Sequence, residues 1–389
     1  MKKILSILLA AALLLTTMAG CGGQKEPEAK EIPDIVPTMF QEITGIPHDK
    51  TVVTVSSTEV PAELYFYWVC YVCSSLEYNI LNDYSNYGMY GGCIDRETMS
   101  VDWNSEYAGI PLMEYALSQA EGTMKYYMSI EELAEDLDAG LTTNNLVDIE
   151  ASFQAAMEEM GGKEAFLNYL QMLGIGRETF DRLSASSFLY INLLDLVFRE
   201  ESPIYLAEED YNKYATYADH ILIANQDMRT GEALPPTQSV EKYQLADSLL
   251  EQILAAEDPQ AKFAELADEY SDDPGREQNP TGYIYTAGTM VEEFEMAASQ
   301  LLPGEFSDVV QSDYGFHIIL RRDLLEALKA DETQKLEIAR EYLDQQLVQK
   351  RSASEVVYDD CLKEIDWVAF YEDYIEKVDA IAAGMQPAQ

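Results

Sequence analysis

The sequence predicts an α+β protein in which a small domain, with a strand near each of its ends, is inserted between two helical segments. Short runs of aliphatic and β-branched residues, typical of buried strands, occur at 218–223 and 314–319. Most of the chain before and after these runs has apolar residues at helical spacing. Hydrophobic residues make up 47% of the 389 residues, enough for the cores of roughly two or three folding units.

The first twenty residues have the pattern of a secretory signal peptide, 1–20. A basic start, Met1-Lys2-Lys3, precedes an uncharged apolar run at 4–17 that is too short to span a bilayer comfortably. Small residues then lead directly into Cys21. This arrangement resembles the lipobox of bacterial lipoproteins, which implies that Cys21 is acylated and becomes the mature N-terminus. An ordinary cleaved signal followed by an incidental cysteine is the alternative.

Residues 21–48 are expected to form an acidic tether, because the stretch is polar, acidic and contains prolines. His48, at its end, is expected to be a solvated linker residue. A short strand is expected at 49–56, followed by a helical domain that extends to residue 205. The expected helices begin at Glu59 and continue at 110–138, 144–160, 163–172 and 176–200.

The first of these helices carries aromatic residues and two cysteines. Its aromatic side chains are either core residues or a surface that holds unfolded apolar segments (Tyr65, Tyr67, Trp68, Tyr71). Cys70 and Cys73 have CxxC spacing, but no histidine is near and no βαβ pattern surrounds them. Buried thiols are therefore favoured over a redox or metal site. An oxidised pair outside the cytoplasm remains open.

A short connecting helix is expected at 206–217, before the inserted domain at 218–323. The chain turns helical again over 324–378 and ends in a tail, 379–389. The 324–378 segment has apolar faces but too little length for a core of its own. It is therefore expected to pack on the N-terminal helices.

Two of the three histidines stand in near-matching positions at the two ends of the inserted domain. His220 is followed by Ile221 and Leu222, and His317 is followed by Ile318 and Ile319. Strands far apart in sequence can be neighbours in a sheet, which would bring the two histidines face to face. Two unrelated core histidines are the alternative.

Three further motifs lie between the histidines, in order: FAELADEYSDD at 263–273, GTMVEEFEMAA at 288–298 and LPGEFSDVV at 302–310. Together with the histidine frames, this ordered set closely resembles the parvulin family of peptidyl-prolyl cis/trans isomerases. The layout of the whole chain resembles the extracytoplasmic PrsA-type and SurA-type foldases, in which the terminal segments form an α-helical chaperone-like module. The resemblance implies a small antiparallel sheet flanked by helices for 218–323.

The resemblance also implies site residues. His220 and His317 correspond to the facing histidines, Asp273 to a position that is cysteine or aspartate, and Ser312 to a polar position on the strand before the second histidine. Met290 and Phe294 correspond to the apolar wall that holds the proline ring, and their i, i+4 spacing predicts one helix face. The family's usual glycine-rich turn is replaced at 279–285, where Tyr283 or Ile284 fills the pocket wall, and Tyr314 is larger than its counterpart in phosphate-directed members.

The function implied is that of a lipid-anchored isomerase on the extracytoplasmic face of the cell membrane, assisting exported proteins that contain X–Pro bonds. No cofactor or metal is implied, because the reaction makes and breaks no covalent bond. A holdase chaperone with a weakly active or inactive domain is the alternative, and a solute-binding lipoprotein is a third reading. The net charge of −45 argues against nucleic acid as a partner. Residues 224–242 lack an arginine cluster, which argues against phosphoserine recognition.

Overall fold

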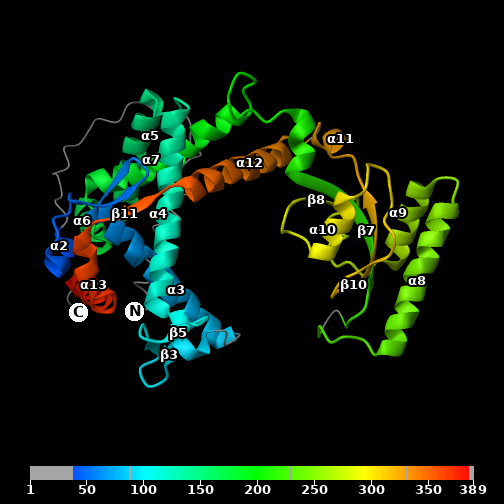
Figure 1. The fold of residues 1–389 in the computed structure, drawn as a ribbon, viewed down its shortest axis with the longest axis horizontal. Helices are drawn as coiled ribbons and strands as arrows, with labels where there is room; N and C mark the ends of the chain where they lie inside the picture. The colour runs from blue at the N-terminus through cyan, green and yellow to red at the C-terminus, as the bar shows by residue number, and fades with distance from the viewer. Residues whose placement is uncertain (1–37, 87–89, 228–229, 330, 385–389) are drawn as a thin grey trace. The chain divides into compact units, whose positions relative to one another are not determined.

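The computed structural model describes residues 38–86, 90–227, 230–329 and 331–384. The expected signal peptide, Cys21 and most of the tether lie outside these ranges. The chain forms two compact units (Figure 1): unit 1 combines the chain up to Leu196 with the residues from Gln346 onward, and unit 2 is Val197–Gln345. The predicted α+β class is confirmed, because unit 2 inserts a small antiparallel sheet into a mainly helical chain.

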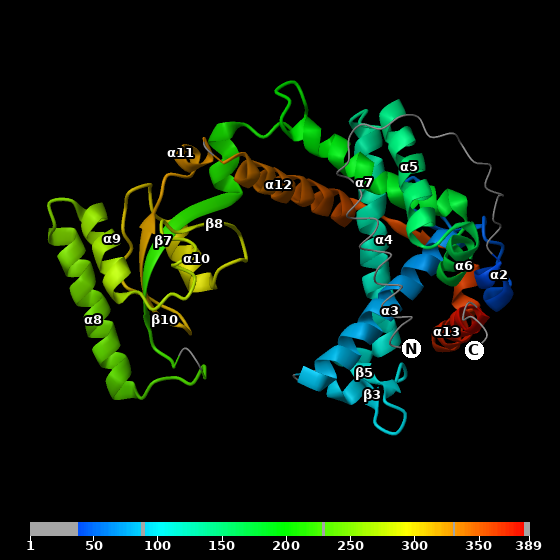
Figure 2. The ribbon, with the colours of Figure 1, turned by 180° about the vertical axis from the view of Figure 1, so that it is seen from behind.

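Unit 1 is mostly helical. Its helices are α2 (Met39–Thr44), α3 (Ala62–Asn86), α4 (Leu112–Asp136), α5 (Thr143–Glu159), α6 (Lys163–Leu173), α7 (Arg177–Val197) and α13 (Trp367–Gly384). The long helices α3 and α4 pack against each other, as both ribbon views show (Figure 1, Figure 2). None of the helices in the described ranges is long and apolar enough to cross a membrane.

Three small sheets complete unit 1. An antiparallel sheet has the strand order β11-β1-β2, with β1 (Thr51–Val55), β2 (Thr58–Pro61) and β11 (Val356–Tyr358). Two strand pairs lie between α3 and α4 in sequence, β3 (Ile94–Asp95) with β4 (Ser100–Val101) and β5 (Glu106–Tyr107) with β6 (Ile110–Pro111). A 3₁₀ turn, η1 (Gly91–Cys93), leads into β3.

The end of the expected tether belongs to the core of unit 1. Helix α2 buries Met39 and Phe40, and the Phe40 ring lies 5.6 Å from the Phe66 ring, measured between centroids. The Nδ1 atom of His48, a residue expected in a solvated linker, lies 3.4 Å from a carboxylate oxygen of the buried Glu63. The tether prediction is therefore wrong from residue 38 onward, because the apolar residues in this short stretch are spaced to bury one helix face.

The C-terminal segment returns to unit 1 through a strand and a helix. β11 pairs with β1 in antiparallel register. With three residues, β11 is too short to stand out in the sequence. Helix α13 packs on α2, α3 and α6, where Tyr374 donates a hydrogen bond to the Met172 carbonyl at 3.0 Å. A 3₁₀ turn, η3 (Asp360–Glu364), joins the two elements.

The expected boundary at residue 324 differs from the structure. Helix α11 (Leu324–Leu328) packs on η2 (Glu208–Lys213) and on the first strand of unit 2. Helix α12 (Glu332–Ala353) runs from unit 2 into unit 1. The segment 324–345 therefore belongs with the inserted domain rather than with the N-terminal helices.

The aromatic and cysteine side chains of α3 are core residues. Tyr65, Tyr67 and Trp68 are buried, as are Cys70 and Cys73. Burial raises the pKa of the Cys73 thiol, and the cysteines in the described ranges are free thiols. The alternative in which these aromatic rings form an exposed surface for unfolded chains is wrong.

Unit 2 is built on a four-stranded antiparallel sheet with the order β8-β7-β10-β9. Its strands are β7 (Ala215–Ala224), β8 (Tyr283–Thr286), β9 (Val310–Gln311) and β10 (Gly315–Arg321). Helices α8 (Pro236–Ala255) and α9 (Pro259–Tyr270) cover one face, and α10 (Glu292–Ser299) covers the other (Figure 1, Figure 2). The expected connecting helix is the short η2, because β7 already begins at Ala215.

The sheet is buried on both faces by different sets of residues. Ile221, Ile223, Ile318 and Leu320 join the core beneath α8 and α9. The alternate residues of the same strands point to the other face and join a second, smaller core beneath α10, which includes Ala218 and Ile319. Buried strands covered on both sides explain the nearly continuous aliphatic runs in the sequence.

Candidate active site

The strand register brings the two histidines together. In the antiparallel pair of β7 and β10, His220 is opposite Ile319 and His317 is opposite Leu222. Residues opposite each other share a face, and so do residues two apart along a strand. His220 and His317 are therefore diagonal neighbours on the α10 face of the sheet.

The two imidazole rings are stacked, with 10° between their planes and 5.3 Å between their centroids. The Nδ1 atoms of His220 and His317 lie 3.1 Å apart. Beyond them, His317 Nε2 lies 2.7 Å from the Ser312 hydroxyl, and His220 Nε2 lies 3.2 Å from Asp273 Oδ2. Four residues placed in this site from the sequence thus form one hydrogen-bonded chain.

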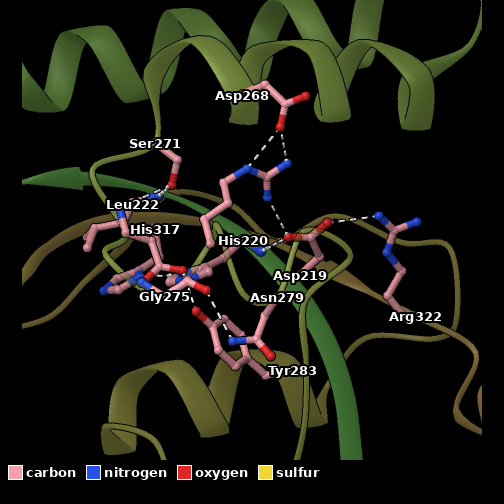
Figure 3. A network of polar contacts seen from close by, with 12 residues as sticks. Asp219, His220, Leu222, Asp268, Ser271, Gly275, Asn279, Tyr283, His317 and Arg322 are labelled. Atoms are coloured by element: carbon pink, nitrogen blue, oxygen red, sulfur yellow. Dashed lines mark hydrogen bonds and ion pairs between the residues drawn. The ribbon is translucent and has the colours of Figure 1, made fainter.

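A fifth residue extends this chain. Tyr283, at the start of β8, donates a hydrogen bond from its hydroxyl to Asp273 Oδ2 at 2.6 Å. The other carboxylate oxygen, Oδ1, accepts the backbone N–H of Gly275 at 3.0 Å. Figure 3 shows Tyr283, His220 and His317 converging from β8, β7 and β10.

The carboxylate fixes one end of the chain. An ionised Asp273 only accepts, so His220 donates to it from Nε2. A neutral His317 carries a single ring N–H, so it donates from one ring nitrogen and accepts at the other, between His220 Nδ1 and the Ser312 hydroxyl. The chain runs from Ser312 through both rings to Asp273.

The electrostatic environment keeps Asp273 ionised and His317 neutral. Burial would raise the pKa of Asp273, but the hydrogen bonds from His220, Tyr283 and the Gly275 amide outweigh it and hold that pKa well below its usual range. Burial, with a smaller contribution from His220, lowers the pKa of His317 to about 3. Burial and the bond to Asp273 both raise the pKa of the Tyr283 hydroxyl.

An apolar wall stands beside the chain. The ring of Phe294, buried on α10, meets both imidazoles edge-on, at 5.2 Å from His220 and 5.6 Å from His317 between centroids. Met290 packs, half-buried, on the same cluster. The prediction that Met290 and Phe294 share a helix face is wrong, because α10 begins at Glu292 and Met290 lies in the turn before it.

Two glycines lie at close approaches around Tyr283, and the sequence had left open whether Tyr283 or Ile284 fills the pocket wall. A Cβ on Gly275 would lie 2.2 Å from the Tyr283 hydroxyl oxygen. A Cβ on Gly282, whose φ is +97°, would lie 2.4 Å from the Ala218 carbonyl oxygen. Both contacts are too close for any other residue to fit without a shift. A glycine directly before a tyrosine at the edge of the site was the one signal available in the sequence.

The part of the chain that carries the site matches a known family model. Residues 220–323 match the Rotamase family, described as the PPIC-type PPIase domain. The Foldase protein PrsA of Staphylococcus aureus (strain MRSA252) is 28% identical over 249 residues, covering 61% of this chain and 71% of that protein. Foldase protein PrsA 4 of Bacillus cereus is 38% identical over 128 residues, covering 33% of this chain and 44% of that protein.

One solved structure is similar to this chain over much of its length. The crystal structure of a PrsA peptidylprolyl isomerase from Bacillus cereus is 23% identical and covers 70% of this chain and 96% of that one, with a TM-score of 0.31.

Proposed function

We propose that this chain, a PrsA-like peptidyl-prolyl cis/trans isomerase of the parvulin type, is a foldase that acts on exported proteins outside the cytoplasm while anchored to the membrane through a lipid on Cys21. The hydrogen-bonded chain from Ser312 to Tyr283, beside the Phe294 wall, is the observation that carries the catalytic part. The signal-like start of the sequence and the foldase names of its relatives support the cellular part.

The reaction requires a rotation rather than bond chemistry. Resonance in the X–Pro amide gives a barrier of about 18–20 kcal/mol, with partial charges on the oxygen and nitrogen of the planar form. Twisting the bond reduces this charge separation. An apolar surface around the amide therefore favours the twisted state over the planar one, and each ~1.4 kcal/mol of such preference accelerates isomerisation tenfold.

The residues of the site suit these demands. Phe294 and Met290 offer the apolar surface against which a proline ring would pack. His220, His317, Asp273 and Ser312 form the polar floor next to it, where Asp273 keeps a negative charge. That charge opposes the build-up of electron density on a nearby carbonyl oxygen, and so disfavours the planar resonance form. Tyr283 joins the proposed set because its hydroxyl holds Asp273 in place.

Two assays run side by side test the proposal. The first follows refolding of a client whose slow step is proline isomerisation, in the presence of the purified protein. The second follows aggregation of a client that has no proline-limited step. A foldase of this kind accelerates the first reaction at substoichiometric concentration. An unchanged refolding rate, together with suppressed aggregation, would instead identify a holdase.

The holdase alternative has a specific observation in its favour. A cavity of about 480 Å³ in unit 1 lies between α4, α5 and α7, and its lining combines apolar side chains with ion pairs of Arg177 and Arg182. The apolar part includes Leu141, Leu146, Ile149 and Leu189, and Leu146 is 56% exposed. Exposed apolar residues of this kind suit weak binding of unfolded segments.

Excising the isomerase domain separates the two activities. The start of β7 and the end of β10 are paired strands, with Ala218 opposite Arg321, so residues 215–323 can be replaced by a short linker. If unit 1 binds clients, the shortened protein still captures a reduced, unfolded model protein. Complete loss of capture, with all of it retained by a separate isomerase domain, would remove the chaperone role from unit 1.

A further inference from the structure

Asp219 is a buried carboxylate beside the active site that the isomerase reaction does not use. It immediately precedes His220 on β7, so its side chain leaves the sheet on the opposite face, towards α9. Asp219 is 1% exposed. A carboxylate so deeply buried is costly unless its oxygens are paired, so its partners require an explanation.

Asp219 is paired with two arginines and one amide. Its Oδ1 accepts hydrogen bonds from Arg276 Nη1 at 3.1 Å and from the His220 backbone N–H at 2.8 Å. Its Oδ2 accepts a hydrogen bond from Arg322 Nη2 at 2.8 Å. Arg276 also reaches Asp268 on α9, at 2.8 Å from Nη2. Figure 3 shows Asp219 between these partners, with Asp268 above it and Arg322 beyond it.

The two arginines come from different parts of the domain. Arg322 follows β10, the strand next to β7, and its backbone N–H donates to the Tyr217 carbonyl. Arg276 lies in the loop 271–282, which also carries Asp273. Only Arg276 therefore links Asp219 to the loop that supplies the carboxylate of the hydrogen-bonded chain.

This loop lies along the edge of β7 beyond the point where β8 stops pairing with it, at Ala218. The Asp272 N–H donates to the Leu222 carbonyl at 2.7 Å, and the Leu222 N–H donates to the Ser271 hydroxyl at 3.1 Å. From this edge the loop sends Asp273 to His220 on one face of the sheet and Arg276 to Asp219 on the other. Consecutive residues of β7 thus hold the loop from both sides.

We propose that Asp219 and Arg276 form a positioning pair that holds the loop 271–282 at the distance where Asp273 accepts from His220. The proposal rests on the site described under the proposed function and assigns neither residue a contact with substrate. A misplacement of about 1 Å at a reacting group lowers rates by up to about 100-fold, so a tie of this kind affects catalysis without touching the reacting bond.

Four single variants of the full-length protein test the pair. Asp219→Asn and Arg276→Gln each break the tie to the loop. Arg322→Gln removes a shorter bond to the same carboxylate, 2.8 Å against 3.1 Å, but leaves the loop attached. Asp268→Asn changes the other partner of Arg276. The Asp268 side chain is 75% exposed. The last two are controls for a general loss of charge pairing in the domain.

Two readouts are measured on every variant. The first is kcat/KM for a short unphosphorylated X–Pro peptide. The second is the ¹⁵N shifts of the His220 and His317 imidazoles, which report whether His220 still donates from Nε2. We expect Asp219→Asn and Arg276→Gln to lose about tenfold in kcat/KM, mainly in kcat, and to change the His220 shifts. Asp268→Asn, which removes an exposed partner, should stay within about twofold, and Arg322→Gln should leave the imidazole shifts unchanged.

The double variant Asp219→Asn/Arg276→Gln completes a cycle. Residues that act as one unit give a combined loss close to the larger single loss, whereas independent residues give the product of both. The proposal is overturned if Arg276→Gln retains wild-type imidazole shifts, or if Arg322→Gln perturbs the shifts as strongly as Arg276→Gln. If the wild-type protein fails to accelerate isomerisation, the catalytic proposal fails, while the imidazole shifts still decide whether the pair positions Asp273.

Discussion

His220 and His317 face each other through the same ring atom, with their Nδ1 nitrogens 3.1 Å apart. One of the two must donate and the other accept, so the pair has a direction. Asp273 accepts from the far nitrogen of the His220 ring, Nε2. Both rings, Ser312 and Asp273 are thus members of one hydrogen-bonded chain, and changes at any member are felt by the others.

Removal of both imidazoles should abolish most of the catalysis. His220→Ala/His317→Ala loses hydrogen bonds of about 1 kcal/mol each, so the rate of X–Pro isomerisation should fall about 10- to 100-fold. The measurement is the exchange of a short unphosphorylated peptide between cis and trans forms. His48→Ala, in unit 1, is the matched control and should leave the rate unchanged. Equal rates for buffer, the wild-type protein and the double variant would contradict the enzyme assignment.

Loss of the Tyr283 hydroxyl should weaken the site without unfolding it. Tyr283→Phe removes the 2.6 Å bond to Asp273, which contributes about 0.5–1.5 kcal/mol, so kcat/KM should fall roughly 2- to 10-fold. The pKa of Asp273 should rise towards its usual value. Tyr243→Phe is the control, because Tyr243 lies on α8 and packs on Phe316 instead. Equal activity of the two variants would remove Tyr283 from the site.

Acid should destabilise unit 2 through His317. The ring is neutral in the folded protein, with a pKa of about 3, whereas an unfolded histidine titrates near pH ~6.5. Between these values the unfolded chain binds more protons, so stability falls as pH falls below 6.5, by about 2 kcal/mol at pH 5. The depressed pKa of Asp273 adds a second loss, below pH ~4.

Pulse proteolysis in urea, scored on the fragment that contains residues 215–323, measures this dependence. His317→Gln lacks the titrating ring, so its urea midpoint should change less between pH 7 and pH 5 than that of the wild type. Parallel curves for the two proteins would show that His317 is not buried in its neutral form.

The C-terminal segment should be indispensable for unit 1. Deletion of 354–389 removes β11 from the sheet and α13 from the core, where Phe370, Tyr371 and Tyr374 are buried. Each large buried side chain lost costs about 3–5 kcal/mol. The truncated unit should therefore lose its cooperative unfolding transition, measured by tryptophan fluorescence.

In the intact protein, a protease cut between α11 and α12 should leave both pieces together in a non-denaturing gel. Free release of the smaller piece would argue against its docking.

Membrane attachment should depend on one atom, the sulfur of Cys21. Cys21→Ser should leave the membrane fraction or retain its signal peptide, because the apolar run before it is too short to span a bilayer comfortably. Several acyl chains anchor a protein far more strongly than one. Unchanged processing and attachment of the variant would mean that another feature holds the protein at the membrane.

Sequence reasoning was strongest where pattern and pairing coincide. Two matching histidine frames suggested that His220 and His317 meet, the ordered motifs between them favoured it over two unrelated core histidines, and the pairing of β7 with β10 confirms it. The same kind of reasoning failed for Met290, where spacing suggested a helix that begins only at Glu292. Met290 and Phe294 are four residues apart, but Met290 lies in a turn and only Phe294 lies on the helix.

Other features left no periodic signal. β11 has three residues and depends on β1 as its partner 300 residues away in the chain, a contact that local pattern does not encode. Phe40 stands in an acidic, proline-containing stretch that reads as a tether until its aromatic partners are known. The Asp219–Arg276 pair is equally non-local, because nothing in either local sequence identifies the partner.

The loop along β7 has a consequence for a protein that would work among unfolded chains. A strand edge with free amides and carbonyls is a template on which another chain can add itself, the first step of aggregation. On this edge of β7, Leu222 is bonded at both its N–H and its carbonyl, and the Ala224 N–H is bonded to Asp272. An extended chain that reached this edge would have to displace the loop that carries Asp273 before it could pair with Leu222, so the segment that supplies Asp273 to the site also covers the exposed side of the strand.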